Sequence, residues 1–186
     1  MPTIIDGRTT VESERDTVTV FLIGMRINNP LAVRSWLPAV RAMPRMLGHL
    51  ERDPASGLLG YHSWLGRTTM LVSYWRNAED LTRFASDPDA PHAPAWRAFN
   101  RSVAATRHVG VWHETYTATA QNSEAIYVNM PTFGLAGAIG GLPVGTGSHT
   151  WKQRMSLRTD CSTATGSSRH AQRDRERAAG RLRGPR

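Results

Sequence analysis

Residues 73–100, SYWRNAEDLTRFASDPDAPHAPAWRAFN, decide how this chain folds. They begin at the end of a strand, and Asn77 follows a tight turn at the position where a side chain caps a helix. The segment 87–91, DPDAP, breaks that helix, and a second helical segment continues to about residue 105. Residues three and four positions apart share a helix face. That face of the second segment carries a histidine and two aromatic residues, which indicate a pocket wall for a flat organic molecule: His92, Trp96 and Phe99.

Strands and helices alternate around this stretch. Runs rich in β-branched and aromatic residues between turn signals predict strands, at 17–27, 58–65, 68–76 and 107–116, with a short fifth strand at 125–128. Gly66-Arg67 separates the second and third of these strands, which predicts a hairpin. The first strand is apolar on both faces, so both faces of the sheet should be covered.

A long helix is predicted between the first two strands. Apolar residues recur at steps of three and four over 31–50, which places them on one helix face. Asn29 is positioned as its N-cap. Pro38 and Pro44 interrupt the pattern, because a proline inside a helix removes a hydrogen bond and crowds the preceding turn. We therefore expect a bend or a break near Met43.

The element order is β-α-β-β-α-β. It predicts an α+β, ferredoxin-like fold with an antiparallel sheet and two helices on one face. The other face is too apolar to be left in water, so two such sheets should pack face to face in a homodimer, as a dimeric α/β-barrel. The domain spans 17–142, after a loose arm at 1–16 and before a basic, disordered tail at 143–186.

Composition limits the kinds of protein this chain can be. The net charge is +8, but ten Lys+Arg and three acids follow residue 147, so the tail carries +7 of it. The nearly neutral body argues against nucleic acid as a partner. No apolar run reaches the roughly 18 residues of a membrane helix, the first residues do not follow a signal-peptide pattern, and the single cysteine, Cys161, has no partner in the chain. We expect a cytoplasmic protein.

Four stretches carry a resemblance to a known family. They are YWRNAEDLTRFA at 74–85, PHAPAWRAFN at 91–100, VWHETY at 111–116 and AIYVNMPTFGLA at 125–136. Together they resemble the antibiotic-biosynthesis monooxygenase (ABM) superfamily of dimeric α/β-barrels. Within it the chain is similar to a small family of monooxygenase-like proteins that includes an enzyme of fungal terpenoid biosynthesis. The resemblance covers about residues 15–137 and leaves out the basic tail.

The resemblance implies a homodimer with one pocket per subunit, between the sheet and the helices. It also implies an oxidoreductase of secondary metabolism, a monooxygenase that acts on a small aromatic or polyketide/terpenoid-type molecule with O2 and without flavin, metal or other cofactor. In such enzymes the deprotonated substrate is the electron source. The protein supplies a base, hydrogen-bond donors for the anion, and a site that excludes water.

Two other functions stay open. One branch of this fold binds and cleaves haem with a tryptophan on the second helix, where this chain has Phe84. That departure argues against haem cleavage but leaves haem binding, or a haem-dependent aldoxime dehydratase-like reaction, with His92 as the iron ligand. The third function is a non-enzymatic dimer that binds a hydrophobic ligand. One fold hosts many activities and does not choose among them.

The candidate site residues follow from these alternatives. His92 and His62 are the candidate catalytic bases, since imidazole titrates near neutral pH; the competing interpretation of His92 is a helix cap. Aromatic residues at these spacings either line a pocket or fill the core, and Arg26 and Asn28 either hold a substrate oxyanion or serve the turn. The candidate substrate-binding residues are Trp64, Tyr74, Trp75, Trp96, Phe99, Arg26 and Asn28. No metal-binding motif is present in the sequence.

Overall fold

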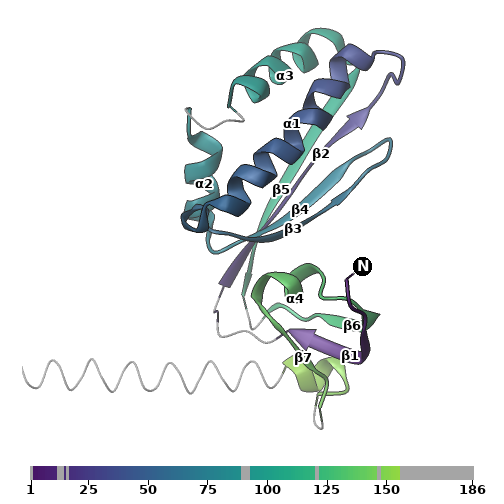
Figure 1. Cartoon of the computed structure of the whole chain (residues 1–186), viewed down its shortest axis with the longest axis vertical. Helices are drawn as coiled ribbons and strands as arrows, with labels where there is room; N and C mark the ends of the chain where they lie inside the picture. The colour runs from purple at the N-terminus through teal and green to yellow at the C-terminus, as the bar shows by residue number, and fades with distance from the viewer. Residues whose placement is uncertain are drawn as a thin grey trace, which may run out of the picture.

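The computed structural model describes residues 2–11, 15, 17–88, 93–119, 122–145 and 148–155. A four-stranded sheet carries the longer helices, and a three-stranded sheet with one short helix lies against one end of it (Figure 1). None of the described helices is long and apolar enough to cross a membrane.

The larger sheet has the predicted ferredoxin-like topology. Its antiparallel strands have the spatial order β3-β4-β2-β5, and the helices enter between them in the sequence β-α-β-β-α-β. The strands are β2 (Thr17–Ile27), β3 (Leu58–Trp64), β4 (Met70–Trp75) and β5 (Val109–Thr119). The connecting helices are α1 (Val33–Arg52), the one-turn 3-10 helix η1 (Pro54–Ser56), α2 (Ala78–Ser86) and α3 (Ala93–Thr106). The predicted fold class is confirmed.

The helices cover one face of this sheet through two apolar clusters. Met25 of β2 packs with Phe99 and Val109, next to the partly buried Trp36 of α1. A second cluster joins Leu50, Trp75 and Leu81, with Phe84 packed against it. Odd-numbered residues of β2 therefore face the helices, and even-numbered residues such as Val20 and Leu22 face the opposite side, because side chains alternate along a strand.

The smaller unit contains a strand that the sequence did not predict. β1 (Ile5–Val11) lies between β6 (Ile126–Met130) and β7 (Gly141–Pro143) in the order β6-β1-β7. Residues 5–11 were expected to belong to a loose arm, but Thr9, Thr10 and Val11 are buried. The threonine hydroxyl of Thr10 donates to the carbonyl of Ala125 at 2.8 Å, so a polar side chain is satisfied inside the unit.

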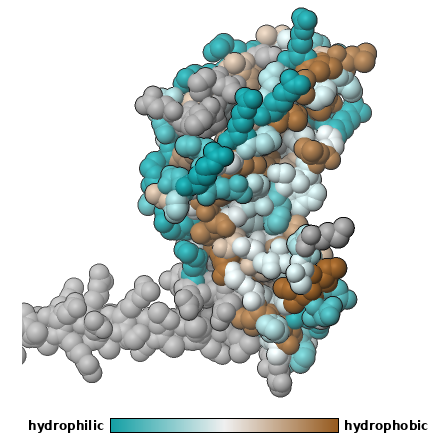
Figure 2. All heavy atoms as spheres, viewed as in Figure 1, coloured by the Kyte–Doolittle hydropathy of each residue, from teal (hydrophilic) through white to brown (hydrophobic). Residues whose placement is uncertain are grey.

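The short helix α4 (Gly134–Ile139) joins the smaller unit to the larger sheet. It packs on β3, where Gly60 has no side chain to hold it away: a Cβ on Gly60 would lie 3.6 Å from Ala138. This contact covers part of the sheet face that the helices α1–α3 leave open. Apolar side chains of the smaller unit remain exposed at Ile4, Ile5 and Val128, and hydrophobic atoms gather on this part of the molecule in Figure 2.

Helix α1 differs from its prediction in two ways. It begins at Val33 without a side-chain cap, because the Asn29 side-chain oxygen accepts instead from the Leu31 N–H at 3.1 Å in the preceding turn. It also continues through Pro38 and Pro44 to Arg52 as one helix. Of the bend or break expected near Met43, the break does not occur. Both prolines are exposed, where water can hydrate a carbonyl that loses its helical partner.

The first residues of the predicted tail are packed. Residues 151–155 are helical, and Arg154, 6% exposed, pairs with Glu124 and donates to the carbonyls of Ser148 and His149 at 3.0 and 2.9 Å. A buried guanidinium needs this set of acceptors to offset its lost hydration. Residues 156–186, which include Cys161, lie outside the described part of the chain.

Candidate functional site

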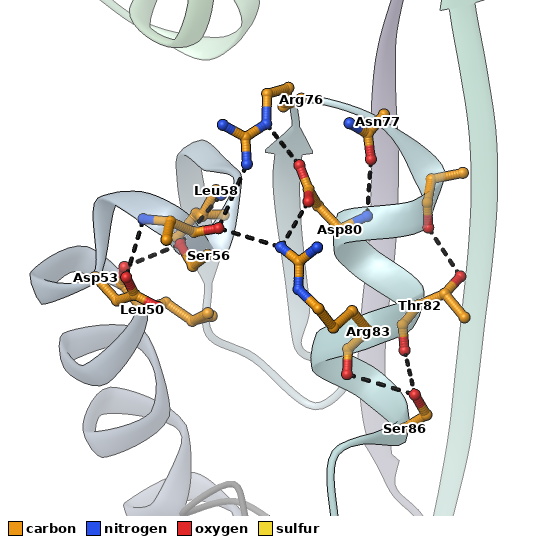
Figure 3. Close-up of polar contacts among 12 residues, drawn as sticks. Leu50, Asp53, Ser56, Leu58, Arg76, Asn77, Asp80, Thr82, Arg83 and Ser86 are labelled. Carbon is orange, nitrogen blue, oxygen red and sulfur yellow. Dashed lines mark hydrogen bonds and ion pairs between the residues drawn. The ribbon is translucent and has the colours of Figure 1, made fainter.

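The turn from β4 into α2 is fixed by a buried carboxylate. Asp80 accepts from the Nε of Arg76 and from a terminal nitrogen of Arg83, both at 2.6 Å, and its backbone N–H donates to the capping side chain of Asn77 at 2.7 Å (Figure 3). The same two arginines donate to the carbonyl of Ala55 in η1 at 3.3 and 3.1 Å. The predicted cap is confirmed, and the network ties η1 to α2.

A groove runs along the outer edge of β3, beside this anchored turn. Its volume is about 580 Å³, which is in the range of sites for small molecules. One wall is the end of α1 with η1, and the other is the segment that leads into α4. We call it the β3-edge groove; its lining residues are Leu50, Glu51, Asp53, Pro54, Leu58, Leu59, Gly60, Tyr61, His62, Thr132, Gly134 and Gly137.

Tyr61 and Glu51 form a pair on one wall of the β3-edge groove. The Tyr61 hydroxyl donates to Oε1 of Glu51 at 3.0 Å. Partial burial, and then the hydrogen bond and the charge of Glu51, raise the pKa of Tyr61 above its ordinary value. Tyr61 is therefore neutral at physiological pH and acts as a donor, and the carboxylate keeps acceptor sites for another group.

His62 lies on the opposite face of β3 and contacts the start of α4. The backbone N–H of Gly134 donates to Nε2 of His62 at 2.8 Å. A backbone N–H can only donate, so Nε2 is the unprotonated nitrogen and the neutral ring carries its proton on Nδ1. Burial lowers the pKa of His62 below its ordinary value, which favours this neutral form. Nδ1–H has no partner among the described residues and remains a donor for a ligand.

Aromatic rings surround this imidazole. Phe133 lies 4.0 Å from His62 between ring centroids, and Trp64 lies 6.1 Å from both. On the neighbouring strand Tyr74 is half-buried near Gly134; burial and then the charge of Tyr127 raise the pKa of Tyr74. The structure thus brings together three of the predicted residues, His62, Trp64 and Tyr74.

The helix-side candidates lie elsewhere. Trp75 is 2% exposed, donates from its ring nitrogen to Ser73 at 2.9 Å and packs on Phe84, so it belongs to the core and not to the groove. Phe99 is likewise buried in the core. Trp96 is 39% exposed on α3, with its ring centroid 6.0 Å from that of Phe99. His92 lies outside the described residues, so its role stays a prediction.

Arg26 and Asn28 serve the loops at the far end of β2. Arg26 donates to the side-chain oxygen of Thr68 at 3.2 Å, and Asn28 donates to the carbonyl of Arg107 at 3.1 Å. Both side chains are exposed. These contacts match the alternative interpretation of the two residues, as parts of the turn.

Comparison with known proteins places the chain in a family. A family model described as monooxygenase af470-like matches residues 18–135. The match contains all of the larger sheet except Thr17, the first residue of β2, and continues through β6 to the residues that meet His62. The chain belongs to the monooxygenase af470-like family.

One curated protein and two solved structures are similar to this chain. The curated protein monooxygenase af470 of Aspergillus fumigatus is 28% identical over 151 residues, which cover 69% of this chain and 53% of that protein. The chain therefore spans about half the length of this relative. Among solved structures, an aldoxime dehydratase bound to butyraldoxime has a TM-score of 0.54 at 18% identity, over 73% of this chain and 39% of the other. A second aldoxime dehydratase has a TM-score of 0.51 at 15% identity, over 74% and 44%. At these identities the likeness shows the fold alone.

The β3-edge groove does not fit haem. A haem iron takes a protein side chain, often a histidine nitrogen, as its axial ligand, and the acceptor nitrogen of His62 is already bonded to Gly134. Glu51 and Asp53 add negative charge to the walls, which disfavours the haem propionates. Within the described part of the chain, no three His, Cys, Asp or Glu side chains gather where they could hold one metal ion.

Sequence reasoning missed most of this site. Glu51 and Tyr61 had no distinctive pattern, and their pairing depends on how the end of α1 meets β3. Phe133, Gly134 and Tyr127 lay in the stretch AIYVNMPTFGLA, which carried the family resemblance without a role for any residue. That stretch was the available signal, because it contains the backbone N–H that bonds to His62.

Proposed function

We propose that this member of the monooxygenase af470-like family is a monooxygenase that acts on a small aromatic or polyketide/terpenoid-type molecule, with O2 as the second substrate and no cofactor. The observation that carries the proposal is the family match over residues 18–135, because it includes both strand β3 and the Phe133-Gly134 turn that meet at the groove. The name of the Aspergillus relative supports the same class of reaction.

The proposed chemistry begins with loss of a proton from the substrate. The resulting anion supplies electrons to O2, one oxygen atom is inserted into the substrate, and the other leaves as water with the two hydrogens that the substrate loses. The protein therefore has to orient the substrate, accept the proton and stabilise the anionic oxygen. We assign the stabilising role to the Nδ1–H of His62, because its Nε2 accepts from Gly134 and cannot also act as the base. The base is then Glu51, whose carboxylate lines the groove, or His92.

We also propose a homodimer that forms through the sheet face opposite the helices α1–α3. Trp64 and Tyr116 lie on this face and are 41% and 54% exposed. Exposed aromatic side chains on a sheet face are typical of a protein interface. Trp112, on the same face, has a buried ring N–H without a partner among the described residues. A monomer in light scattering at micromolar concentration would contradict this part of the proposal.

Oxygen uptake tests the proposed reaction. The full chain is incubated with 1,4-dihydroxynaphthalene and related hydroquinones in the presence of a metal chelator, and consumption of O2 is measured above the rate of autoxidation. We expect enzyme-dependent uptake that persists with the chelator and falls about 100-fold or more in His62→Phe, the loss expected when an oxyanion donor is removed. Uptake that depends on added haemin, with a Soret band that His92→Ala abolishes, would instead support the haem-dependent function.

A further inference from the structure

We infer that the β3-edge groove binds an uncharged, polyhydroxylated aromatic or enolic molecule. This inference rests on the proposed monooxygenase function, since it assigns that molecule as the substrate. It narrows the substrate class from small aromatic compounds in general to those without a carboxylate, phosphate or other fixed negative charge.

The size and the apolar surface of the groove suit an aromatic ring system. A volume of about 580 Å³ accommodates two or three fused rings. Four of the lining residues are apolar, and they come from α1, η1 and β3: Leu50, Pro54, Leu58 and Leu59. Burial of a ring against such side chains contributes roughly 25 cal/mol for each Å² removed from water.

The acceptors in the groove select for hydroxyl groups. Glu51 uses Oε1 to accept from Tyr61, while its Oε2 has no partner among the described residues. Asp53 uses Oδ1 to accept from the Ala55 N–H at 2.9 Å. An ionised carboxylate accepts hydrogen bonds only, so a ligand that satisfies the remaining oxygens has to bring O–H or N–H donors.

The charge of the groove selects against anions. Two carboxylates line it, and none of the described lining residues is a lysine or arginine. The nearby guanidinium groups of Arg76 and Arg83 are already paired with Asp80. Two unit charges about 4 Å apart repel by about 1 kcal/mol even in water, so a ligand that arrives as an anion meets repulsion from both carboxylates. A substrate anion formed by proton transfer to Glu51 faces only Asp53, because the protonated Glu51 is neutral.

His62 supplies the complementary donor on the other side of the strand. Since Tyr61 and His62 are neighbours in β3, their side chains point to opposite faces, and both line the groove. A ligand that extends around this strand edge meets acceptors at Glu51 and a donor, Nδ1–H, at His62. A molecule with hydroxyl groups at both ends satisfies both walls, because a hydroxyl both donates and accepts.

A matched pair of ligands tests the inference without any turnover. 1,4-Dihydroxynaphthalene and 1,4-dihydroxy-2-naphthoate have the same ring and hydroxyl groups and differ by one carboxylate. Each is titrated into the full chain by isothermal titration calorimetry under nitrogen, so that neither is oxidised. We expect the neutral compound to bind at least about tenfold more tightly, as repulsion by two carboxylates predicts.

Two variants locate the source of this preference. Glu51→Gln keeps an oxygen for Tyr61 and removes the charge, and we expect it to reduce the ratio of the two dissociation constants at least about threefold. Glu79→Gln is the control, because Glu79 is an exposed carboxylate in the first turn of α2 that does not line the groove, so the ratio should not change.

The outcomes separate this inference from the proposed function. Equal or tighter binding of the naphthoate, no binding of either compound, or an unchanged ratio in Glu51→Gln would overturn the inference even if O2 uptake is observed. Selective binding that Glu51→Gln weakens supports it. If that binding occurs without O2 uptake, the monooxygenase function fails while the assignment of the groove and its ligand class stands.

Discussion

The Nε2 atom of His62 accepts a hydrogen bond from the backbone N–H of Gly134 at 2.8 Å. This bond connects the edge strand β3 of the larger sheet with the first residue of α4, 72 positions further along the chain. It has two consequences. It assigns the tautomer of the imidazole, and it makes the docking of α4 depend on the charge of one side chain.

We expect His62→Phe to lower the free energy of unfolding by about 1–3 kcal/mol, because it leaves the Gly134 N–H without an acceptor in a partly buried position. His62→Gln carries an amide oxygen that can accept from the same N–H, so it should retain part of the lost stability. Urea denaturation followed by fluorescence measures both. His49→Gln, on the exposed side of α1, is the control and should stay within about 0.5 kcal/mol of the parent. Equal stability of His62→Phe and the parent would contradict the role of this bond.

Stability should depend on pH through His62. Burial lowers the pKa of His62 in the folded state, so the unfolded chain binds a proton more readily than the folded chain. The stabilisation from neutral His62 is therefore fully present above the unfolded pKa of about 6.5 and is lost as the pH falls through the lower, folded pKa. Between those values the free energy of unfolding should rise with pH, by at most about 1.4 kcal/mol per pH unit for one proton.

The comparison of the parent with His62→Gln isolates this effect, since the variant lacks the titrating group. Between pH 8 and pH 5, the difference in unfolding free energy between the parent and His62→Gln should be largest above about pH 6.5 and should shrink as the pH falls below that value. A constant difference across that range would show that the protonation of His62 is not coupled to folding.

Asp80 is the centre of the polar network that holds η1 against α2. We expect Asp80→Ala to lower the free energy of unfolding by about 1–3 kcal/mol, because the buried carboxylate accepts from Arg76 and Arg83. The side chains of both arginines are exposed, so in Asp80→Ala water replaces part of the hydrogen bonding that they lose. Glu79→Gln, its exposed neighbour in the first turn of α2, should change stability by less than about 0.5 kcal/mol. Thermal unfolding that does not distinguish the two variants would contradict this role.

Gly57 lets this network close, and its replacement tests the geometry directly. A Cβ at this position would lie 2.3 Å from Oδ2 of Asp80, and the backbone has φ +84°. Gly57→Ala therefore combines a steric clash with a left-handed backbone that alanine disfavours by roughly 1–2 kcal/mol. We expect a loss of about 2–4 kcal/mol of unfolding free energy. Gly66→Ala, where the nearest atom lies 3.7 Å from the added Cβ, is the control and should be nearly neutral in the same urea titration.

The sequence predicted the larger sheet because its signals are local. Asn77 caps α2 from three residues away, and the strands before it alternate in a pattern that adjacent residues define. β1 carried no such signal: its residues are mostly polar, and the partners that bury them lie more than 100 positions away, as in the bond from Thr10 to Ala125. The unbroken α1 shows the opposite error, where a local rule about prolines was outweighed by the tertiary packing of Leu47 and Leu50.

For the site, too, the sequence predicted what depends on residue type and neighbouring positions, and missed what depends on contacts between distant segments. His62 could be proposed from its residue type, because imidazole is suited to proton transfer. Its assignment as a donor required Gly134, and the acceptor wall of the groove required Glu51 to meet Tyr61 across the end of α1. Trp75 was proposed as a ligand contact from its place in an aromatic strand, yet it faces the helices and is buried. The face to which a strand residue points depends on the packing of the sheet, which the alternation alone does not define.

The packed start of the tail leads to a prediction about truncation. A disordered tail over 143–186, as the sequence predicted, could be removed without loss of the fold. The structure changes that expectation, because Arg154 is buried, pairs with Glu124 and donates to two carbonyls. A chain that ends at residue 155 should unfold at the temperature of the full chain. A chain that ends at residue 147 should unfold several degrees lower, since loss of Arg154 leaves the largely buried Glu124 carboxylate unpaired.

Arg154→Ala in the full chain should reproduce the lower melting temperature, and Lys152→Ala, exposed in the same helical turn, should not. Equal melting temperatures for the two truncations, measured by differential scanning calorimetry, would show that the Arg154–Glu124 pair does not stabilise the smaller unit.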